Sequence, residues 1–136
     1  MKRLLLSLTL LAALPVLANA TLFTQYEAVR KSFLASSFKD VQSGAKQLAA
    51  EARSAKQAEV AKQADAVAAA ADLDAARVAF GALSTEMKKV HDAAAKGDRP
   101  AVYYCPMVRQ SWLQPKGEVG NPYDAAMPTC GALQKE

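Results

Sequence analysis

Apolar residues recur every three or four positions through the first two thirds of the chain, a spacing that places their side chains on one face of an α-helix. The first helix predicted in this way ends before Ser36 and Ser37, a pair that favours a turn and a new helix start. Its apolar stripe consists of Leu22, Tyr26, Val29 and Phe33.

A second apolar stripe extends over residues 38–71. No glycine or proline lies between its two halves, so the pattern is compatible with one long helix or with two shorter ones. A disordered, low-complexity segment over 45–76 is a further alternative, against which the aromatic residues of the domain argue. The first half of the stripe comprises Val41, Ala45, Leu48, Ala52 and Ala55, and the second half Val60, Ala64 and Val67.

A last helix is predicted to begin after Asp72 or Asp74, either of which can cap it, and to stop near Gly97. Three or four helices joined by short turns predict an antiparallel bundle over residues 21–97. Alanine contributes little buried area, so the helices must approach closely and the stability is expected to be modest. The stripe of the last helix is Leu73, Ala76, Phe80, Leu83, Met87, Val90 and Ala94.

The remaining segment, residues 98–136, has a different composition. It holds five of the six prolines, the only tryptophan and both cysteines, which indicates irregular structure packed on the bundle. The predicted fold class is therefore all-α, an antiparallel three- to four-helix bundle followed by an irregular C-terminal segment of the same domain.

The N-terminus has the three-part pattern of a cleaved secretory signal peptide over residues 1–20. Lys2 and Arg3 precede an apolar run over 4–17, and the tripeptide Ala-Asn-Ala at 18–20 offers small residues to a signal peptidase. The run is too short for a spanning helix, which needs about 20 apolar residues. We expect export to the bacterial periplasm, without stable membrane insertion once the signal is removed; an uncleaved anchor is the alternative.

Charge and residue types argue against two classes of function. The chain has 17 basic and 13 acidic residues, and loss of Lys2 and Arg3 leaves 15 basic against 13 acidic residues, a net charge of +2. Because these charges are mixed along the helices without a basic stripe, nucleic acid is not an expected partner. The single histidine and the lack of a Gly-rich phosphate loop in the sequence argue against an enzyme.

Sulfur-bearing residues form two pairs in the C-terminal segment, Cys105 with Met107 and Met127 with Cys130. Thiolates and thioethers are soft ligands, so four sulfurs gathered by one loop favour Cu(I) or a related soft ion. A proline inside each pair stiffens the backbone and lowers the cost of gathering the ligands. His91 is an additional candidate ligand, and its alternative role is that of a partner of the helix dipole.

The same two cysteines, Cys105 and Cys130, are candidates for a disulfide, the expected state of an even pair in an exported protein. Such a bond would stabilise the fold by roughly 3 kcal/mol, and the two methionines would then fill gaps in the packing. The aromatic residues Tyr104, Trp112 and Tyr123 are predicted to seal the segment onto the bundle. Alternatively, Trp112 covers a bound Cu(I) ion as a cation–π lid.

The motifs of this tail follow one another as Tyr-Cys-Pro-Met at 104–107, Trp112, Asn-Pro-Tyr at 121–123 and Met-x-x-Cys-Gly at 127–131. In this order they resemble a bacterial family of periplasmic domains of unknown function. Domains of that family also occur attached to the adaptor subunits of heavy-metal efflux systems. The resemblance implies a link to copper or another soft metal, and a heavy-metal efflux adaptor or another periplasmic protein as partner. It implies no established activity.

Two functional hypotheses follow. The first is a periplasmic soft-metal binding protein that sequesters Cu(I) or delivers it to efflux through Cys105, Met107, Met127 and Cys130. The second is a disulfide-stapled helical module for protein interactions, in which the sulfurs are structural and no cofactor is bound.

Overall fold

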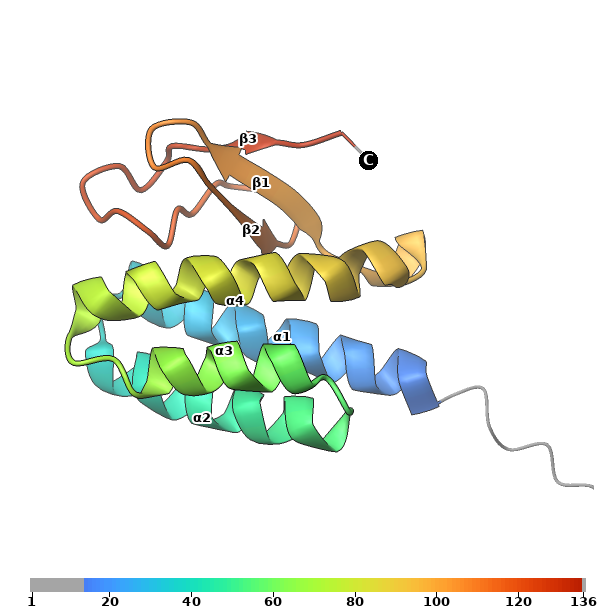
Figure 1. The fold of residues 1–136 in the computed structure, drawn as a ribbon. Helices are drawn as coiled ribbons and strands as arrows, with labels where there is room; N and C mark the ends of the chain where they lie inside the picture. Colours follow the sequence, from blue (N-terminus) through green and yellow to red (C-terminus); the bar gives the residue numbers. More distant parts are fainter. Residues whose placement is uncertain (1–13, 136) are drawn as a thin grey trace, which may run out of the picture.

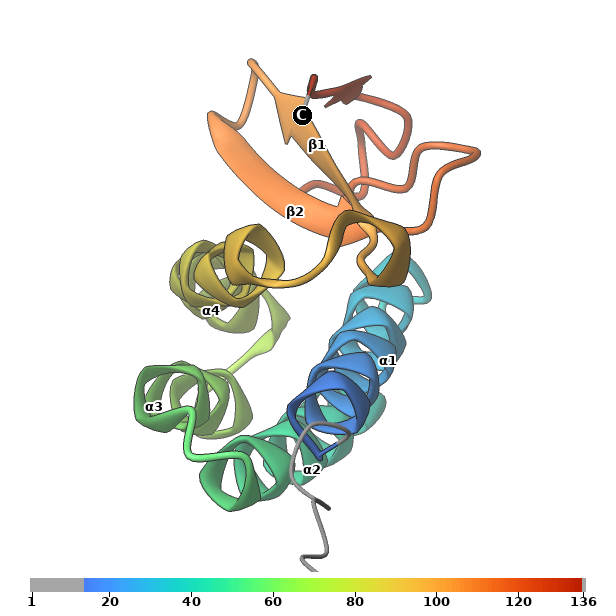
Figure 2. The ribbon, with the colours of Figure 1, turned by 90° about the vertical axis from the view of Figure 1, so that its right-hand side faces the viewer.

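The computed structural model describes residues 14–135 and shows four helices beneath a small antiparallel sheet (Figure 1). Successive helices are joined by short connections and contact one another, and α1 also contacts α4, which closes the bundle (Figure 2). The predicted helical bundle is therefore confirmed with four helices. In chain order they are α1 (Leu14–Leu34), α2 (Phe38–Ser54), α3 (Ala58–Ala68) and α4 (Leu73–Ala93).

The stretch over 38–71 forms two helices rather than one. Between α2 and α3, Lys56 adopts a left-handed conformation with φ of 58°. Gln57 N–H donates to Ala52 O at 2.8 Å, so the turn satisfies a carbonyl group that the helix end leaves open. Ser36, with φ of 51°, follows the end of α1 in the same way. The chain reverses at both places without a glycine, which is why the sequence leaves the break after α2 unmarked.

Asp72, rather than Asp74, caps α4. The Asp72 carboxylate accepts a hydrogen bond from Ala75 N–H at 2.8 Å, which satisfies one of the open donors of the first turn. The helix ends at Ala93, and the short 3₁₀ helix η1 (Lys96–Asp98) then leads into the sheet.

The apolar stripes of the four helices form the core. The ring of Phe80 lies at its centre, with its centroid 5.0 Å from that of Tyr26 and 4.9 Å from that of Phe33. Small side chains on α2 and α3 allow these helices to approach closely, as the alanine-rich sequence predicts. They are the buried residues Ala45, Ala49, Ala52, Ala61 and Ala64.

The C-terminal segment is not irregular throughout, so the all-α prediction is wrong there. Three strands form an antiparallel sheet in the order β2-β1-β3. Tyr103 lies opposite Trp112 on one side and opposite Leu133 on the other. Valine, tyrosine and tryptophan favour extended strands, a signal that the surrounding prolines obscured. The strands are β1 (Ala101–Cys105), β2 (Gln110–Gln114) and β3 (Ala132–Leu133).

The sheet lies over α1 and α4, on the side of the bundle away from α2 and α3 (Figures 1 and 2). Val102 and Leu113 belong to the core of the bundle. Tyr103, Cys105 and Trp112 belong to a second apolar cluster, to which the loop 115–131 contributes. Alternate strand residues therefore pack into two different cores. One lies between the sheet and the helices, and the other, called the outer cluster here, lies between the sheet and that loop.

The predicted signal peptide lies largely outside the described residues, which begin at Leu14. Within α1, the side chains of Val16 and Leu17 are 50% and 65% exposed, whereas Leu22 and Phe23 are buried. Among residues 16–34 of α1, the buried core therefore begins at Leu22. Among residues 14–135, no helix combines the length and the apolar character needed to cross a lipid bilayer.

Candidate functional site

A disulfide joins the two cysteines, which confirms the predicted pairing. The Sγ atoms of Cys105 and Cys130 are 2.03 Å apart, and the bond spans a sequence separation of 25 residues. Cys105 ends β1 and is fully buried, whereas Cys130 precedes β3 and is half-buried. The bond therefore fixes the loop over the outer cluster to the middle strand of the sheet.

The turn between β1 and β2 carries Met107 beside this disulfide. Arg109 N–H donates to Cys105 O at 2.9 Å, and Arg109 has a left-handed φ of 54°, which closes a tight turn over residues 106–109. Met107 is 72% exposed in this turn and belongs to neither apolar cluster. Its thioether is therefore accessible from solvent.

A second turn brings Met127 to the same end of the sheet. Cys130 N–H donates to Met127 O at 3.2 Å, so residues 127–130 form a β-turn. Asn121 is buried and holds this turn, because its Nδ2 donates to Met127 O at 3.0 Å and its backbone N–H to Pro128 O at 2.8 Å. The four sulfur-bearing residues thus lie on two turns that the disulfide joins.

Tyr123 anchors the loop to the helical bundle. Its hydroxyl donates to Ser111 O at 2.6 Å and lies 2.8 Å from Ser84 Oγ, which is 2.6 Å from the hydroxyl of Tyr26. Its ring centroid is 5.8 Å from that of Phe80. Burial raises the pKa of Tyr123 well above its ordinary value; the neighbouring Tyr26 adds to this shift and the bond to Ser84 opposes it. Burial likewise raises the pKa of Tyr26, so both phenols are neutral at physiological pH.

Trp112 lies within the outer cluster. Its side chain is 1% exposed, its ring stacks on Tyr103 with centroids 6.1 Å apart, and it meets Tyr123 edge-on. The backbone of Gly131 packs against the indole so closely that an added Cβ would lie 2.5 Å from the ring. Trp112 thereby fastens the segment next to Cys130 to the sheet.

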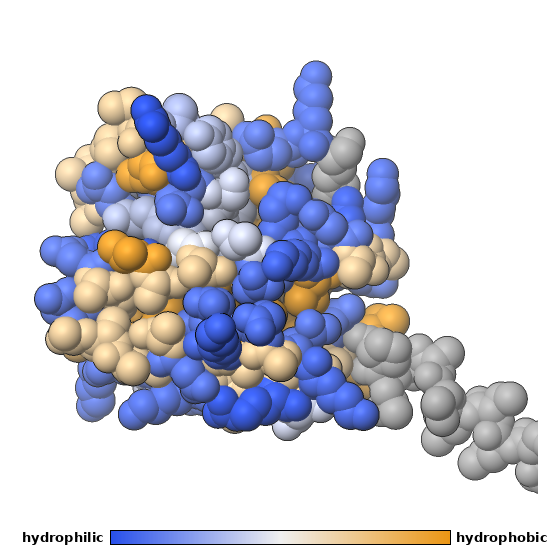
Figure 3. All heavy atoms as spheres, viewed as in Figure 1, coloured by the Kyte–Doolittle hydropathy of each residue, from blue (hydrophilic) through white to orange (hydrophobic). Residues whose placement is uncertain are grey.

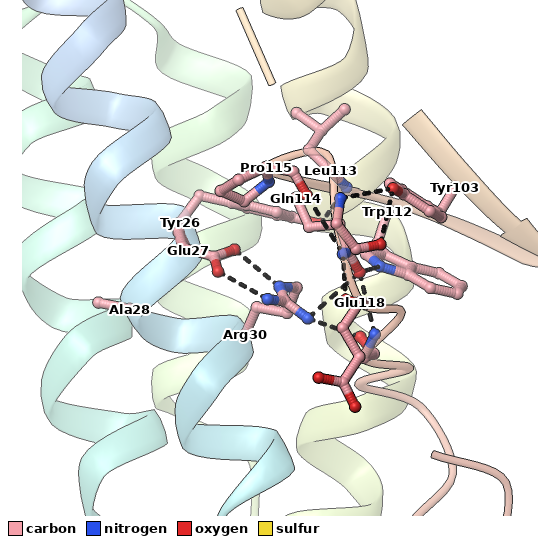
Figure 4. A network of polar contacts seen from close by, with 12 residues as sticks. Tyr26, Glu27, Ala28, Arg30, Tyr103, Trp112, Leu113, Gln114, Pro115 and Glu118 are labelled. Atoms are coloured by element: carbon pink, nitrogen blue, oxygen red, sulfur yellow. Dashed lines mark hydrogen bonds and ion pairs between the residues drawn. The ribbon is translucent and has the colours of Figure 1, made fainter. Parts of the chain in front are cut away.

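A buried polar network, which the sequence analysis missed, ties α1 to the loop after β2 (Figure 4). Arg30 is 5% exposed; its Nε and Nη2 donate to the two carboxylate oxygens of Glu27 at 2.7 and 2.6 Å, and its Nη1 donates to Gly120 O at 2.7 Å. Gln114 Oε1 accepts from Trp112 Nε1 at 2.9 Å and from Gly120 N–H at 3.1 Å. An arginine beside the apolar stripe of the first helix is the sequence signal that points to such a network.

His91 lies near the end of α4, packed against the chain that enters β1. Its ring is 2% exposed, with Nε2 2.9 Å from Pro100 O and Nδ1 2.9 Å from Asp92 Oδ1. Both ring nitrogens therefore already have protein partners. The half-buried Tyr104 lines the same hollow of about 590 Å³ as His91. Because Tyr104 and Cys105 are adjacent on β1, their side chains point to opposite faces, and the structure does not bring His91 to the sulfur-bearing turns.

Among residues 14–135, no group of three or more His, Cys, Asp or Glu side chains is arranged to hold a metal ion. Comparisons with models of protein families, with curated proteins and with solved structures found no match. The family resemblance of the tail stays a prediction.

Proposed function

We propose that this protein binds a soft metal ion, with Cu(I) favoured, at the disulfide end of the sheet. The observation that carries the proposal is that the bond between Cys105 and Cys130 joins the turn bearing Met107 to the turn bearing Met127. Two separate motifs that bear sulfur are thereby linked through one covalent bond, which supports the proposal. Thioether and thiolate sulfurs favour Cu(I) over harder cations.

The donor set fits this ion after reduction of the disulfide, because a thiolate is the metal ligand. A dithiol of the thiol–disulfide oxidoreductase class supplies the two electrons and two protons. The bond between Cys105 and Cys130 breaks, two thiols form, and the reductant becomes a disulfide. Each thiol that then binds Cu(I) releases its proton, so the affinity falls as the pH falls.

Burial sets the order in which the sulfurs become available. Met107 is exposed and is the first sulfur that an incoming ion meets, whereas Cys105 is fully buried. When the disulfide is broken, the hydrogen bonds of Asn121 and the contact of Trp112 with Gly131 still hold the covering loop. The two thiols then stay close together, and such preorganisation lowers the cost of gathering the ligands.

The proposed setting is the periplasm, after cleavage of residues 1–20. Val16 and Leu17 are exposed, and Leu22 is the first buried residue among 16–34, so cleavage after Ala20 would keep every described core residue in the chain. A disulfide is compatible with an oxidising compartment. The proposed role is sequestration of the ion or its exchange with an adaptor subunit of a heavy-metal efflux system, without a catalytic step.

A Cu(I) titration tests this function. The full chain is expressed with its N-terminal segment, and the form that accumulates is purified without oxygen, before and after dithiol reduction. Competition with a chromogenic Cu(I) chelator is expected to show stoichiometric binding to the reduced protein only, with loss of binding in Cys105→Ser. The mass of the same sample tests export, since cleavage predicts a chain that begins at Thr21. A reduced protein that takes up no Cu(I) would contradict the metal role.

A second function, the disulfide-stapled interaction module, is favoured by one observation. Cys105 is fully buried and its bond ties the middle strand to the covering loop, as a structural disulfide does. In this case reduction lowers the free energy of unfolding and creates no affinity for Cu(I). The titration above, combined with urea unfolding of both redox forms, separates the two functions.

A further inference from the structure

A groove lies at the end of the β1–β2 hairpin opposite to the disulfide. It has a volume of about 870 Å³ and runs between residues 20–31 of α1, η1 and the end of β2. The strand register places Ala101 opposite Gln114 at this end and Cys105 opposite Gln110 at the other. The two ends of β1 are about 13 Å apart, so the groove and the sulfur-bearing turns are separate.

The inner lining of the groove is apolar. Phe23 and Tyr26 of α1 and Leu113 of β2 are buried side chains that line it, and Pro100 and Pro115 come from the chain on either side of the hairpin. Proline fixes its backbone φ angle, which stiffens both segments. The shape of the groove is therefore largely formed before any ligand arrives.

The rim of the groove is cationic. Lys31 of α1, Lys96 of η1 and Lys116 after β2 are exposed and line it, and none of the ion pairs found within residues 14–135 includes them. Of the two carboxylates that line the groove, Glu27 is held by the buried guanidinium of Arg30 at 2.6 Å. The other carboxylate, Asp98, is exposed and balances one positive charge, so the three lysines, which come from three separate segments, leave an excess of positive charge at the rim.

We infer that this groove binds an acidic segment of a partner protein, in which aspartate or glutamate residues flank an apolar side chain. Lysines from three segments beside one apolar surface are complementary to several negative charges around an apolar centre. A polypeptide segment offers that arrangement, whereas a small monocarboxylate offers one charge. The inference goes beyond the metal role and does not depend on it, because the groove shares no residue with the sulfur-bearing turns.

Fluorescence anisotropy with a labelled probe peptide tests the inference. The probe contains Leu and Phe flanked on both sides by paired Glu, and its matched control carries Gln in place of Glu. The triple variant Lys31→Glu, Lys96→Glu and Lys116→Glu is compared with Lys39→Glu, Lys46→Glu and Lys135→Glu, which makes the same change of charge at exposed positions outside the groove. Circular dichroism checks that both variants are folded.

The wild-type protein is expected to bind the Glu probe saturably and the Gln probe at least about tenfold more weakly. The groove variant is expected to lose at least about tenfold in affinity, while the control variant stays within about twofold of the wild type. Three outcomes would overturn the inference: no saturable binding of the Glu probe, equal losses in both variants, or equal binding of both probes. A further result would also overturn it: the protein binds anionic phosphatidylglycerol vesicles through the groove lysines but does not bind the Glu probe.

Discussion

The indole ring of Trp112 packs directly against the backbone of Gly131, and a Cβ at position 131 would approach the ring to 2.5 Å and Val119 Cγ1 to 2.9 Å. The contact fastens the chain next to Cys130 onto the sheet. Because there is no space for a Cβ beside the ring, position 131 requires glycine.

Gly131→Ala is therefore expected to lower the free energy of unfolding by about 2 kcal/mol, the cost of overpacking a rigid site. Urea unfolding followed by tryptophan fluorescence measures the change. Gly97→Ala is the matched control, because an added Cβ there meets nothing within 4 Å. Equal stability of the Gly131→Ala and Gly97→Ala variants would show that the loop shifts freely and that the contact does not fix it.

Arg30→Met is expected to cost about 3 kcal/mol of folding free energy, because it leaves Glu27 without its cation and Gly120 O without its donor. The control is Arg53→Met, whose ion pair with Asp65 is exposed and contributes less than about 1 kcal/mol. Urea unfolding of both variants provides the comparison. Equal costs for the two would mean that the buried network does not hold the loop.

The stability of the protein is expected to fall in alkaline solution, because burial raises the pKa of Tyr26 and Tyr123 above their ordinary value of 10.0. The unfolded chain loses these protons near pH 10, whereas the folded chain keeps them. Their contribution is therefore complete below pH 10 and is lost as the pH rises toward the folded-state values.

Above pH 10, the free energy of unfolding should fall by up to about 1.4 kcal/mol per pH unit for each tyrosine. Tyr123→Phe should make this slope shallower, although the variant is less stable at neutral pH because it loses the bond to Ser111 O. Urea unfolding at a series of pH values measures both slopes. The same slope in wild type and variant would rule out Tyr123 as a source of the pH dependence.

The helices are the part of the fold that the sequence predicts well. The spacing of Leu22, Tyr26, Val29 and Phe33 places these four residues on one buried face, and an aspartate at 72 supplies the cap of α4. The break after α2 leaves no such trace, because Lys56 takes the left-handed conformation that glycine usually provides.

The strands and the sites depend on contacts between distant parts of the chain, which the spacing of apolar residues does not reveal. Val102 and Tyr103 favour a strand, but their short segment lies among prolines, which indicate irregular structure. The pairing of Cys105 with Cys130 could be proposed from the even cysteine count, and the structure confirms it. The groove could not, because its lysines come from three segments that only the tertiary fold brings together.

A substitution at Met107 can separate metal binding from packing. The side chain of Met107 is 72% exposed and belongs to neither apolar cluster, so its replacement should have little effect on packing. Met107→Leu is expected to change the free energy of unfolding by less than about 0.5 kcal/mol. If the thioether binds Cu(I), the same variant should weaken Cu(I) binding by the reduced protein by about tenfold or more, since a leucine side chain offers no soft donor. Chelator competition and urea unfolding on one preparation measure both quantities. Met87→Leu serves as the control, because that methionine is fully buried in the helical core and should leave the affinity unchanged. Unchanged affinity in Met107→Leu would remove this residue from the site and leave the two thiolates and Met127 as the ligands.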